Sequence, residues 1–252
     1  MTIQYCSDLH LEFRANSQFL RENPIIPNGD ILILAGDIIP FSELNNYSDF
    51  FDALSNQFKT VYWIPGNHEY YHGDAMQRSG AFFENIRENV FLINNRIVSL
   101  GDTRLVFSTL WSYIAPLNQW AIEKQMNDFR AIKYGKKRLS TINFNKFHEG
   151  ARKFLTETFD QPFEGKTIVV THHVPTMEHY PEIYRGSVLN MAFASELSQL
   201  IETSGADYWI YGHHHYNTEC FYIGKTMMLT NQLGYVNQDE HKDFSREAYF
   251  TI

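Results

Sequence analysis

The stretch Ile31–Asp37, "ILILAGD", runs through four large apolar side chains and an alanine and then stops abruptly in Gly36 and Asp37. A continuous apolar run of this length is typical of a strand buried on both faces, because a strand with one face in water alternates apolar and polar residues. Four other runs end in the same way, in polar residues of the Asp, Asn or His type: "IQYC" (3–6), "VYWI" (61–64), "TIVVT" (167–171) and "YWIY" (208–211). These runs predict strands that are covered on both sides.

The segments between the runs supply helices as covers. Three groups of apolar residues recur at helical spacing: Tyr47, Phe50, Phe51, Leu54 and Phe58; Phe147, Ala151, Phe154 and Leu155; and Phe193, Leu197, Leu200 and Ile201, the last group after a predicted N-cap at Asn190. The interval from Asp37 to Asn67, about 30 residues, has the length of a β-α-β unit. The first sheet is therefore expected to be partly parallel.

Later segments with alternating side chains predict a second sheet that is mixed or antiparallel: "RIVSL" (96–100), "RLVFSTL" (104–110), "TMMLTN" (226–231) and "EAYFTI" (247–252). No internal repeat or Pro/Gly/Ser-rich linker divides the chain, which favours a single domain over residues 1–252. The expected architecture is two sheets packed together with helices outside.

Composition narrows the classes of partner. The 29 acidic against 21 basic residues give a net charge of -8, which disfavours long nucleic acid and anionic membranes as partners. The one dense basic strip, Lys136 to Arg138, is interpreted as a solvated loop or helix end. Two cysteines, Cys6 and Cys220, are too few for a disulfide framework, and both are read as buried thiols. With no signal-like N-terminus or membrane-length apolar stretch, we expect a cytoplasmic protein.

Side chains of metal-binding or acid/base type gather just after the five apolar runs. In open α/β sheets ligands bind outside the carboxyl ends of the strands, so these side chains predict one site. Imidazole, carboxylate and amide ligands without sulfur suit Mn, Fe or Zn. Without His68, an acid/base candidate, the seven remaining ligands are too many for one tetrahedral ion, and two ions about 3.5 to 4 Å apart with a bridging carboxylate and water would use them all. The residues are Asp8, His10, Asp37, Asn67, His68, His172, His213 and His215.

The order of these residues resembles the calcineurin-like metallophosphoesterase superfamily. The motifs are D-x-H (Asp8, His10), G-D (Gly36, Asp37), G-N-H-E (Gly66 to Glu69), H-H-x-P (His172 to Pro175) and G-H-x-H (Gly212 to His215). Each motif alone is a weak signal, whereas five in the family's order are specific. The resemblance spans residues 8 to 215 and implies a four-layer αββα sandwich, in which two packed mixed sheets are flanked by helices.

The resemblance also implies a role for each motif residue. Asp8, His10 and His215 would hold the first metal ion, and Asn67, His172 and His213 the second, with Asp37 bridging both. His68 would not be a ligand; it would act as general acid at the leaving-group oxygen or stabilise the transition state by hydrogen bonding.

Two histidine runs leave assignments to be settled. In "THHVPT" His172 is preferred as ligand because it comes first after the strand, while a shift of one residue would make His173 the ligand. In "YGHHHYN" the alternation of side chains along an extended segment would turn His213 and His215 to the metal and His214 away.

Other residues carry weaker signals. His72, His148, His179 and His241 lack motif support and are interpreted as surface or packing residues. Glu69 either orients a ligand or is solvated, and Arg14 and Arg130 either contact phosphate or make ordinary surface ion pairs. The aromatic-rich segment 111–145 is read either as an insertion that covers the site or as a helical pair packed on the core.

Taken together, these patterns predict a dinuclear metal-dependent phosphoesterase, with a weak preference for a small phosphodiester or nucleotide, in which a metal-bound hydroxide attacks phosphorus. A nuclease of the same superfamily is the enzymatic alternative and would need a basic groove. A catalytically silent scaffold with the same fold is the alternative of a different class. The complete set of predicted ligands favours the enzyme.

Overall fold

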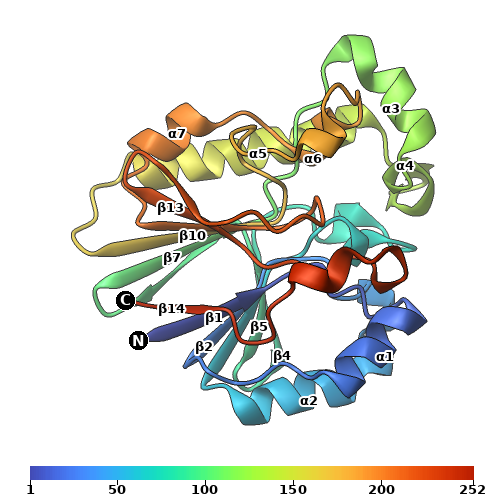
Figure 1. The fold of residues 1–252 in the computed structure, drawn as a ribbon. Helices are drawn as coiled ribbons and strands as arrows, with labels where there is room; N and C mark the ends of the chain where they lie inside the picture. Colours follow the sequence, from blue (N-terminus) through green and yellow to red (C-terminus); the bar gives the residue numbers. More distant parts are fainter.

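The structure is a computed structural model that describes residues 1–252, and its core is a pair of six-stranded sheets packed face to face (Figure 1). The first sheet has the order β14 (Tyr249–Thr251), β1 (Thr2–Cys6), β2 (Ile31–Leu34), β3 (Thr60–Trp63), β5 (Val90–Asn94), β4 (Phe82–Arg87). The second has the order β12 (Phe221–Ile223), β13 (Thr226–Thr230), β11 (Tyr208–Tyr211), β10 (Lys166–Thr171), β7 (Thr103–Ser108), β6 (Arg96–Leu100).

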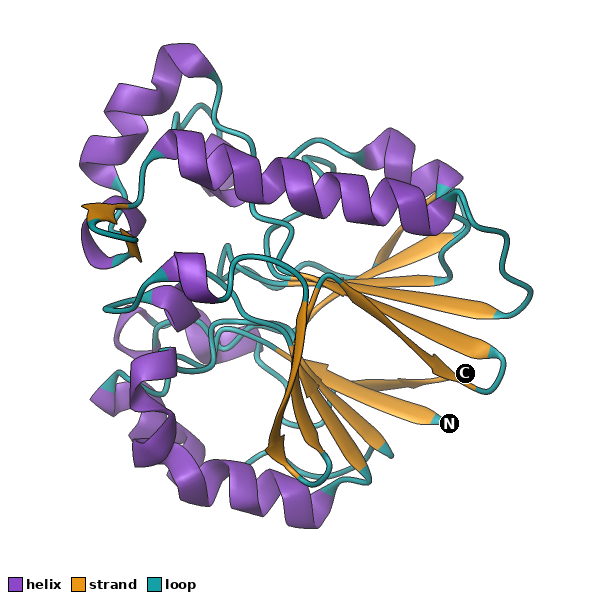
Figure 2. Ribbon diagram, turned by 180° about the vertical axis from the view of Figure 1, so that it is seen from behind, coloured by secondary structure: helices purple, strands orange, loops and turns teal.

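Helices cover the outer face of each sheet. Figure 1 shows α1 and α2 beneath the first sheet and α5 and α7 above the second, and the view from behind in Figure 2 shows the same four layers. The predicted αββα sandwich is confirmed. The helices are α1 (Arg14–Glu22), α2 (Ser48–Gln57), α3 (Gln119–Gln125), α4 (Asp128–Ala131), α5 (Thr141–Phe159), α6 (Asn190–Phe193) and α7 (Ser198–Thr203).

Burial on both faces explains the continuous apolar runs. In β2, Leu32 and Leu34 belong to the core beneath the first sheet, which also holds Phe51 of α2. Ile31 and Ile33 point the other way, into the core between the two sheets. A strand that is buried on both faces has no polar positions to alternate, so the run is apolar throughout.

Both sheets are parallel at the centre and antiparallel at the edges. In the first sheet β1, β2, β3 and β5 are parallel, and β14 and β4 flank them antiparallel. In the second, β13, β11, β10 and β7 are parallel, between antiparallel β12 and β6. Because the carboxyl ends of parallel strands meet at one edge, the ends of β1, β2, β3, β10 and β11 lie on the same side of the sandwich.

The placement of "EAYFTI" in the second sheet was wrong. Its strand β14 pairs antiparallel with β1 of the first sheet, with Ile3 opposite Phe250. The pairing covers the outer edge of β1, whose N–H and C=O groups would otherwise lack partners. Figure 1 accordingly places the two chain termini side by side.

The single helix predicted after Asn190 is broken into α6 and α7. Ala194 pairs with Val174 in a parallel bridge, and its backbone is extended where α6 ends. Asn190 is the first residue of α6 and does not cap it. Its side-chain amide donates instead to the Tyr184 carbonyl at 2.8 Å. The apolar spacing correctly predicted which side chains pack inward. The residues between α6 and α7, however, run along Val174 at the sheet edge and interrupt the helix.

Segment 111–145 packs on the core and also lies beside the strand ends. Trp111, Ile122, Phe129 and Phe144 share one buried cluster with Tyr70. Lys136 to Arg138 are solvated as expected, but only Lys136 lies in a loop. It forms the turn of a two-stranded hairpin, β8 (Lys133–Tyr134) with β9 (Lys137–Arg138), and the other two form β9.

Two further expectations concern cysteines and membranes. Cys6 is buried as predicted, but Cys220 is exposed just before β12, so that prediction was wrong. No helix combines the length and the apolar character needed to cross a bilayer.

Helix α5 carries a glycine that offers a test of its packing. A Cβ added at Gly150 would meet no atom within 4 Å. We expect Gly150→Ala to raise the free energy of unfolding by about 0.5–1 kcal/mol, because glycine loses more conformational entropy in a helix than alanine. Urea unfolding followed by circular dichroism measures this change. A decrease in stability would contradict the open environment at this position.

Candidate metal centre and active-site cavity

The seven side chains predicted as ligands meet where the ends of the five parallel strands converge. Three groups of potential ligand atoms form there, each with its atoms within 4.8 Å of one another, and one of them joins His10 with Glu12 and His68. We call Asp8, His10, Asp37 and His215 the Asp8 cluster, and Asp37, His172 and His213 the His172 cluster. Asp37 belongs to both clusters, as a bridging carboxylate would.

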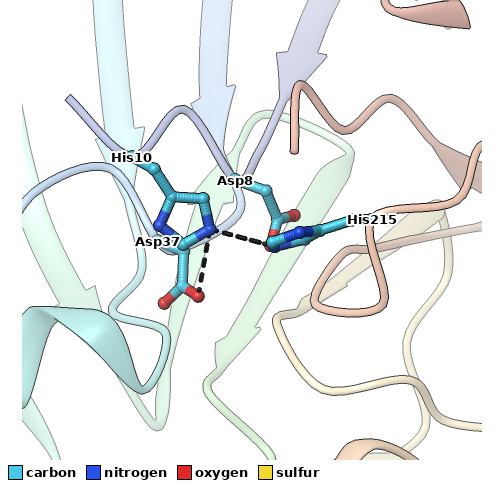
Figure 3. Close-up of side chains that lie close together, drawn as sticks. All are labelled: Asp8, His10, Asp37 and His215. Carbon is cyan, nitrogen blue, oxygen red and sulfur yellow. Dashed lines mark hydrogen bonds and ion pairs between the residues drawn. The ribbon is translucent and has the colours of Figure 1, made fainter. Parts of the chain in front are cut away.

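The Asp8 cluster draws its members from three strand ends, and its four side chains converge in Figure 3. His10 Nε2 lies 2.9 Å from His215 Nε2 and 3.7 Å from Asp37 Oδ2. His215 Nε2 lies 3.3 Å from Asp8 Oδ1. The four side chains are close enough to share one ion.

The His172 cluster lies beside it. His172 Nε2 is 3.3 Å from Asp37 Oδ2 and 3.1 Å from His213 Nδ1. Asn67 is only 2% exposed, and its carbonyl oxygen Oδ1 has no hydrogen-bond partner. A buried acceptor without a partner costs about 1–3 kcal/mol, which an ion would offset.

The geometry distinguishes His172 from His173. The His172 ring faces Asp37, whereas both ring nitrogens of His173 are buried without a polar partner. The His173 ring packs 5.3 Å from Trp111 and 4.0 Å from His213, measured between ring centroids. His172 thus reaches Asp37, and His173 supports the ring of His213 from behind.

The imidazoles are oriented as metal ligands require. His10 and His215 direct Nδ1 to the carboxylates of Glu12 and Glu240, at 3.3 and 2.7 Å, so their Nε2 lone pairs point at each other. His172 likewise directs Nδ1 to the Ala35 carbonyl at 2.9 Å, which leaves Nε2 facing His213. With Nδ1 engaged in this way, Nε2 of each of these three rings is left facing its cluster. The donor set therefore fits two metal ions.

Backbone conformation holds these side chains in place. Asp8, His10, Asp37, His213 and His215 all have positive φ, between 45° and 82°. Such residues cost about 1–3 kcal/mol each when the conformation is strained, and they concentrate at functional sites. His214 does point away, toward Gln232, but left-handed backbone at His213 and His215 turns the chain there, so the predicted alternation was the wrong reason.

Two glycines let the loops approach the clusters. At Gly66 an added Cβ would clash with the Asp37 carboxylate, and at Gly212 it would lie 2.5 Å from Asp8 Oδ2. Any larger residue would displace a carboxylate from its cluster, which is why glycine precedes the polar residues of these motifs.

His68 lies at the edge of the Asp8 cluster and joins neither group of ligands around Asp37. Its Nδ1 lies 2.9 Å from Glu12 Oε1, and its Nε2 lies 3.4 Å from the hydroxyl of Tyr235. Tyr71 stacks on the ring at a centroid distance of 4.0 Å. Glu12 was missed in the sequence, although it follows His10 at the same two-residue spacing that separates His10 from Asp8.

A family of known proteins matches most of this sequence. The family model for calcineurin-like phosphoesterases matches residues 1–217. The chain belongs to this family. It is accordingly a metal-dependent phosphoester hydrolase with an αββα fold.

Two similar proteins extend over nearly the whole chain. The uncharacterized protein L509 of Acanthamoeba polyphaga mimivirus is 32% identical over 280 residues, covering 99% of this chain and 96% of that protein. The crystal structure of phosphopantetheinyl hydrolase from Mycobacterium tuberculosis superposes with a TM-score of 0.74 at 18% identity, covering 99% of this chain and 95% of that one. At this identity, the similarity to phosphopantetheinyl hydrolase shows only that the two chains share a fold.

The phosphoesterase site opens into a cavity of about 340 Å³. Its wall includes residues that sequence reasoning did not find, because they come from loops far apart in the chain. Arg14 and Arg130 are exposed and do not line it, and Arg130 instead donates to the Lys124 carbonyl. The newly found lining residues are Tyr71, Met126, Asp128, Tyr180, Tyr184, Phe193, Tyr235 and Glu240.

Burial and neighbouring charges tune the ionisation of the two clusters. Burial, together with nearby His173, holds the pKa of His213 well below its usual value, which keeps the imidazole neutral as a ligand must be. Burial alone would raise the pKa of Asp37, but the charges of His172 and His68 lower it well below the usual range. The shared carboxylate is therefore ionised.

Glu69 binds the loops of the site together and is not solvated. Its carboxylate is fully buried and accepts N–H bonds from the backbone of Asp37, Ile38 and Gly66, at 2.7 to 2.9 Å, and from the Trp63 indole at 3.0 Å. Burial and the nearby charge of Asp37 raise the pKa of Glu69 to about 8. The side chain positions the backbone on both sides of the shared carboxylate.

We expect Glu69→Ala to lower the free energy of unfolding by about 3 kcal/mol or more, because four buried N–H donors would lose their acceptor. Urea unfolding measures the loss. Glu149→Ala, at an exposed position of α5, is the matched control and should stay within about 0.5 kcal/mol of the original protein. Equal effects of the two substitutions would contradict the role of Glu69.

Proposed function

We propose that the protein hydrolyses a small phosphoester, a phosphodiester or a nucleotide, at two metal ions held by the two clusters. Asp8, His10 and His215 would hold one ion, and His172, His213 and Asn67 the other, with Asp37 shared. The donor set suits Mn, Fe or Zn. Bound ions of this kind stabilise negative charge on phosphoryl oxygens and lower the pKa of the attacking water.

The chain's own residues supply orientation and proton transfer. Glu12, Glu240 and the Ala35 carbonyl orient the imidazoles, as the distances above show. His68 faces the cavity with Nε2 near the Tyr235 hydroxyl and Nδ1 on Glu12, so it can give a proton to the departing alkoxide while Glu12 stabilises the charged ring.

The observation that carries this proposal is the shared position of Asp37 between two sets of imidazoles that open into one cavity. A scaffold would not need Glu12, Glu240 and the Ala35 carbonyl to orient the imidazoles, and here every predicted ligand is a residue that can bind metal. No lysine or arginine lines the cavity, which argues against a nuclease because a long polyanion requires cationic contacts.

The test is hydrolysis of a nitrophenyl phosphate monoester and its bis-ester by protein that has been stripped of metal and reloaded with Mn, Fe, Zn or Mg. We expect turnover to require metal and to saturate at two equivalents, with the ratio of the two rates assigning mono- or diester preference. Turnover that survives complete metal removal would overturn the proposal. Two bound equivalents without any turnover would favour the scaffold.

A further inference from the structure

The cavity wall is unusual for a site that receives a phosphoester because it contains no lysine or arginine. Its two carboxylates outside the clusters are Asp128 and Glu240. Glu240 is engaged, since it accepts from His215 Nδ1 at 2.7 Å and from the Tyr235 backbone at 2.6 Å. A second phosphate or carboxylate on the substrate would meet no lysine or arginine here.

Asp128 differs from Glu240 in having a fully buried oxygen that lacks a partner. It is the first residue of α4, is 1% exposed and lines the cavity. Its Oδ2 accepts from the Tyr71 hydroxyl at 3.3 Å, but its Oδ1 is buried with no hydrogen-bond partner. An unpaired buried acceptor of this kind is costly, so a ligand that brings a donor gains by satisfying it.

The position of Asp128 indicates which part of the substrate it would meet. The Tyr71 ring that donates to Asp128 also stacks on His68, at a centroid distance of 4.0 Å. His68 is the residue placed at the leaving-group oxygen. Asp128 therefore lies on the leaving-group side of the cavity.

The remaining wall is aromatic. Tyr180, Tyr184 and Phe193 line the cavity, and Phe193 stacks on His213 at a centroid distance of 4.6 Å. A volume of about 340 Å³ leaves room for an organic group beyond the phosphate. Flat apolar faces with one free carboxylate oxygen suit a group that carries hydroxyl or amino donors without further negative charge.

We propose that Asp128 is a specificity-determining residue that accepts a hydrogen bond from a hydroxyl or amino group on the leaving group. The substrate class is then a phosphoester of an uncharged or cationic group that bears such a donor, and not a polyphosphate or bisphosphate. This inference rests on the proposed phosphoesterase function and adds the identity of the leaving group to it.

The test compares two leaving groups of matched size, 2-hydroxyethyl and propyl, each as the phosphate monoester and as the methyl diester. The metal-loaded protein is expected to prefer the hydroxyethyl ester, and Asp128→Ala to reduce that preference by about tenfold or more, as for loss of a hydrogen bond to a charged group. The intrinsic reactivities of the esters cancel when the same pair is compared between the two proteins. Nitrophenyl phosphate, which has no donor at this position, should lose less than about threefold.

Two outcomes would overturn the inference. A control substitution at an exposed acidic residue shows whether the leaving-group preference changes for reasons unrelated to the cavity. Asp49→Asn, at an exposed residue in the first turn of α2, should leave the preference unchanged. If Asp128→Ala slows both esters equally, Asp128 only supports the wall and the inference fails while the phosphoesterase stands. If the original protein hydrolyses no ester with any metal, the proposed function fails and the inference fails with it.

Discussion

Asp37→Asn is expected to remove the activity and one or both metal ions. The Asp37 carboxylate is the only group that belongs to both clusters, and its Oδ2 lies 3.3 Å from His172 Nε2 and 3.7 Å from His10 Nε2. An amide would offer one oxygen and turn an NH2 group toward the other ligands. Because loss of a residue that merely orients a ligand costs about 10–100-fold, loss of the shared ligand should cost more than about 100-fold in kcat/KM.

Metal content by mass spectrometry and kcat/KM for a nitrophenyl ester measure the two effects together. Asp160→Asn, an exposed position just after α5, is the matched control and should keep both ions and full activity. Two tightly bound ions in Asp37→Asn, with activity within a few-fold of the original, would contradict the shared role of this carboxylate.

His68→Asn is expected to lower kcat by about 10²–10⁴-fold and leave the metal content unchanged. His68 hydrogen-bonds through Nδ1 to Glu12, and its Nε2 lies near the Tyr235 hydroxyl, so neither nitrogen is needed to hold an ion. The loss should be larger for an alkyl ester than for a nitrophenyl ester, because a poor leaving group depends more on protonation. A residue with a purely structural role would slow both esters alike.

His72→Asn is the control for this substitution. His72 is exposed and has φ of 63°, a conformation that asparagine tolerates, so we expect no change in kcat. Loss of metal from His68→Asn would contradict the separation of His68 from the ligands. Glu12→Gln should give a smaller loss, about 10–100-fold, since Glu12 acts through His68 and His10.

Local sequence determined the strands and most of the site. The apolar runs before Asp8, Asp37, Asn67, His172 and His213 are buried strands because no position along them faces water. In parallel sheets the carboxyl ends of such strands must come together, so the residues that follow them meet without any knowledge of loop structure. For this reason the convergence of these side chains could be predicted from the strand pattern, while the αββα fold followed from the family's motif order.

Only the tertiary structure decided which elements meet from far apart in the chain. Strand β14 joins the first sheet because β1 has a free edge there, and nothing in "EAYFTI" encodes that partner. Glu69 is buried because four N–H donors from two separate segments, 37–38 and 63–66, surround it. His172 rather than His173 reaches Asp37 because of the direction in which β10 ends. Asp128 enters the cavity through the packing of α4 against Tyr71. Hydrophobic periodicity records whether a residue is buried, whereas the identity of its neighbours depends on how distant segments pack.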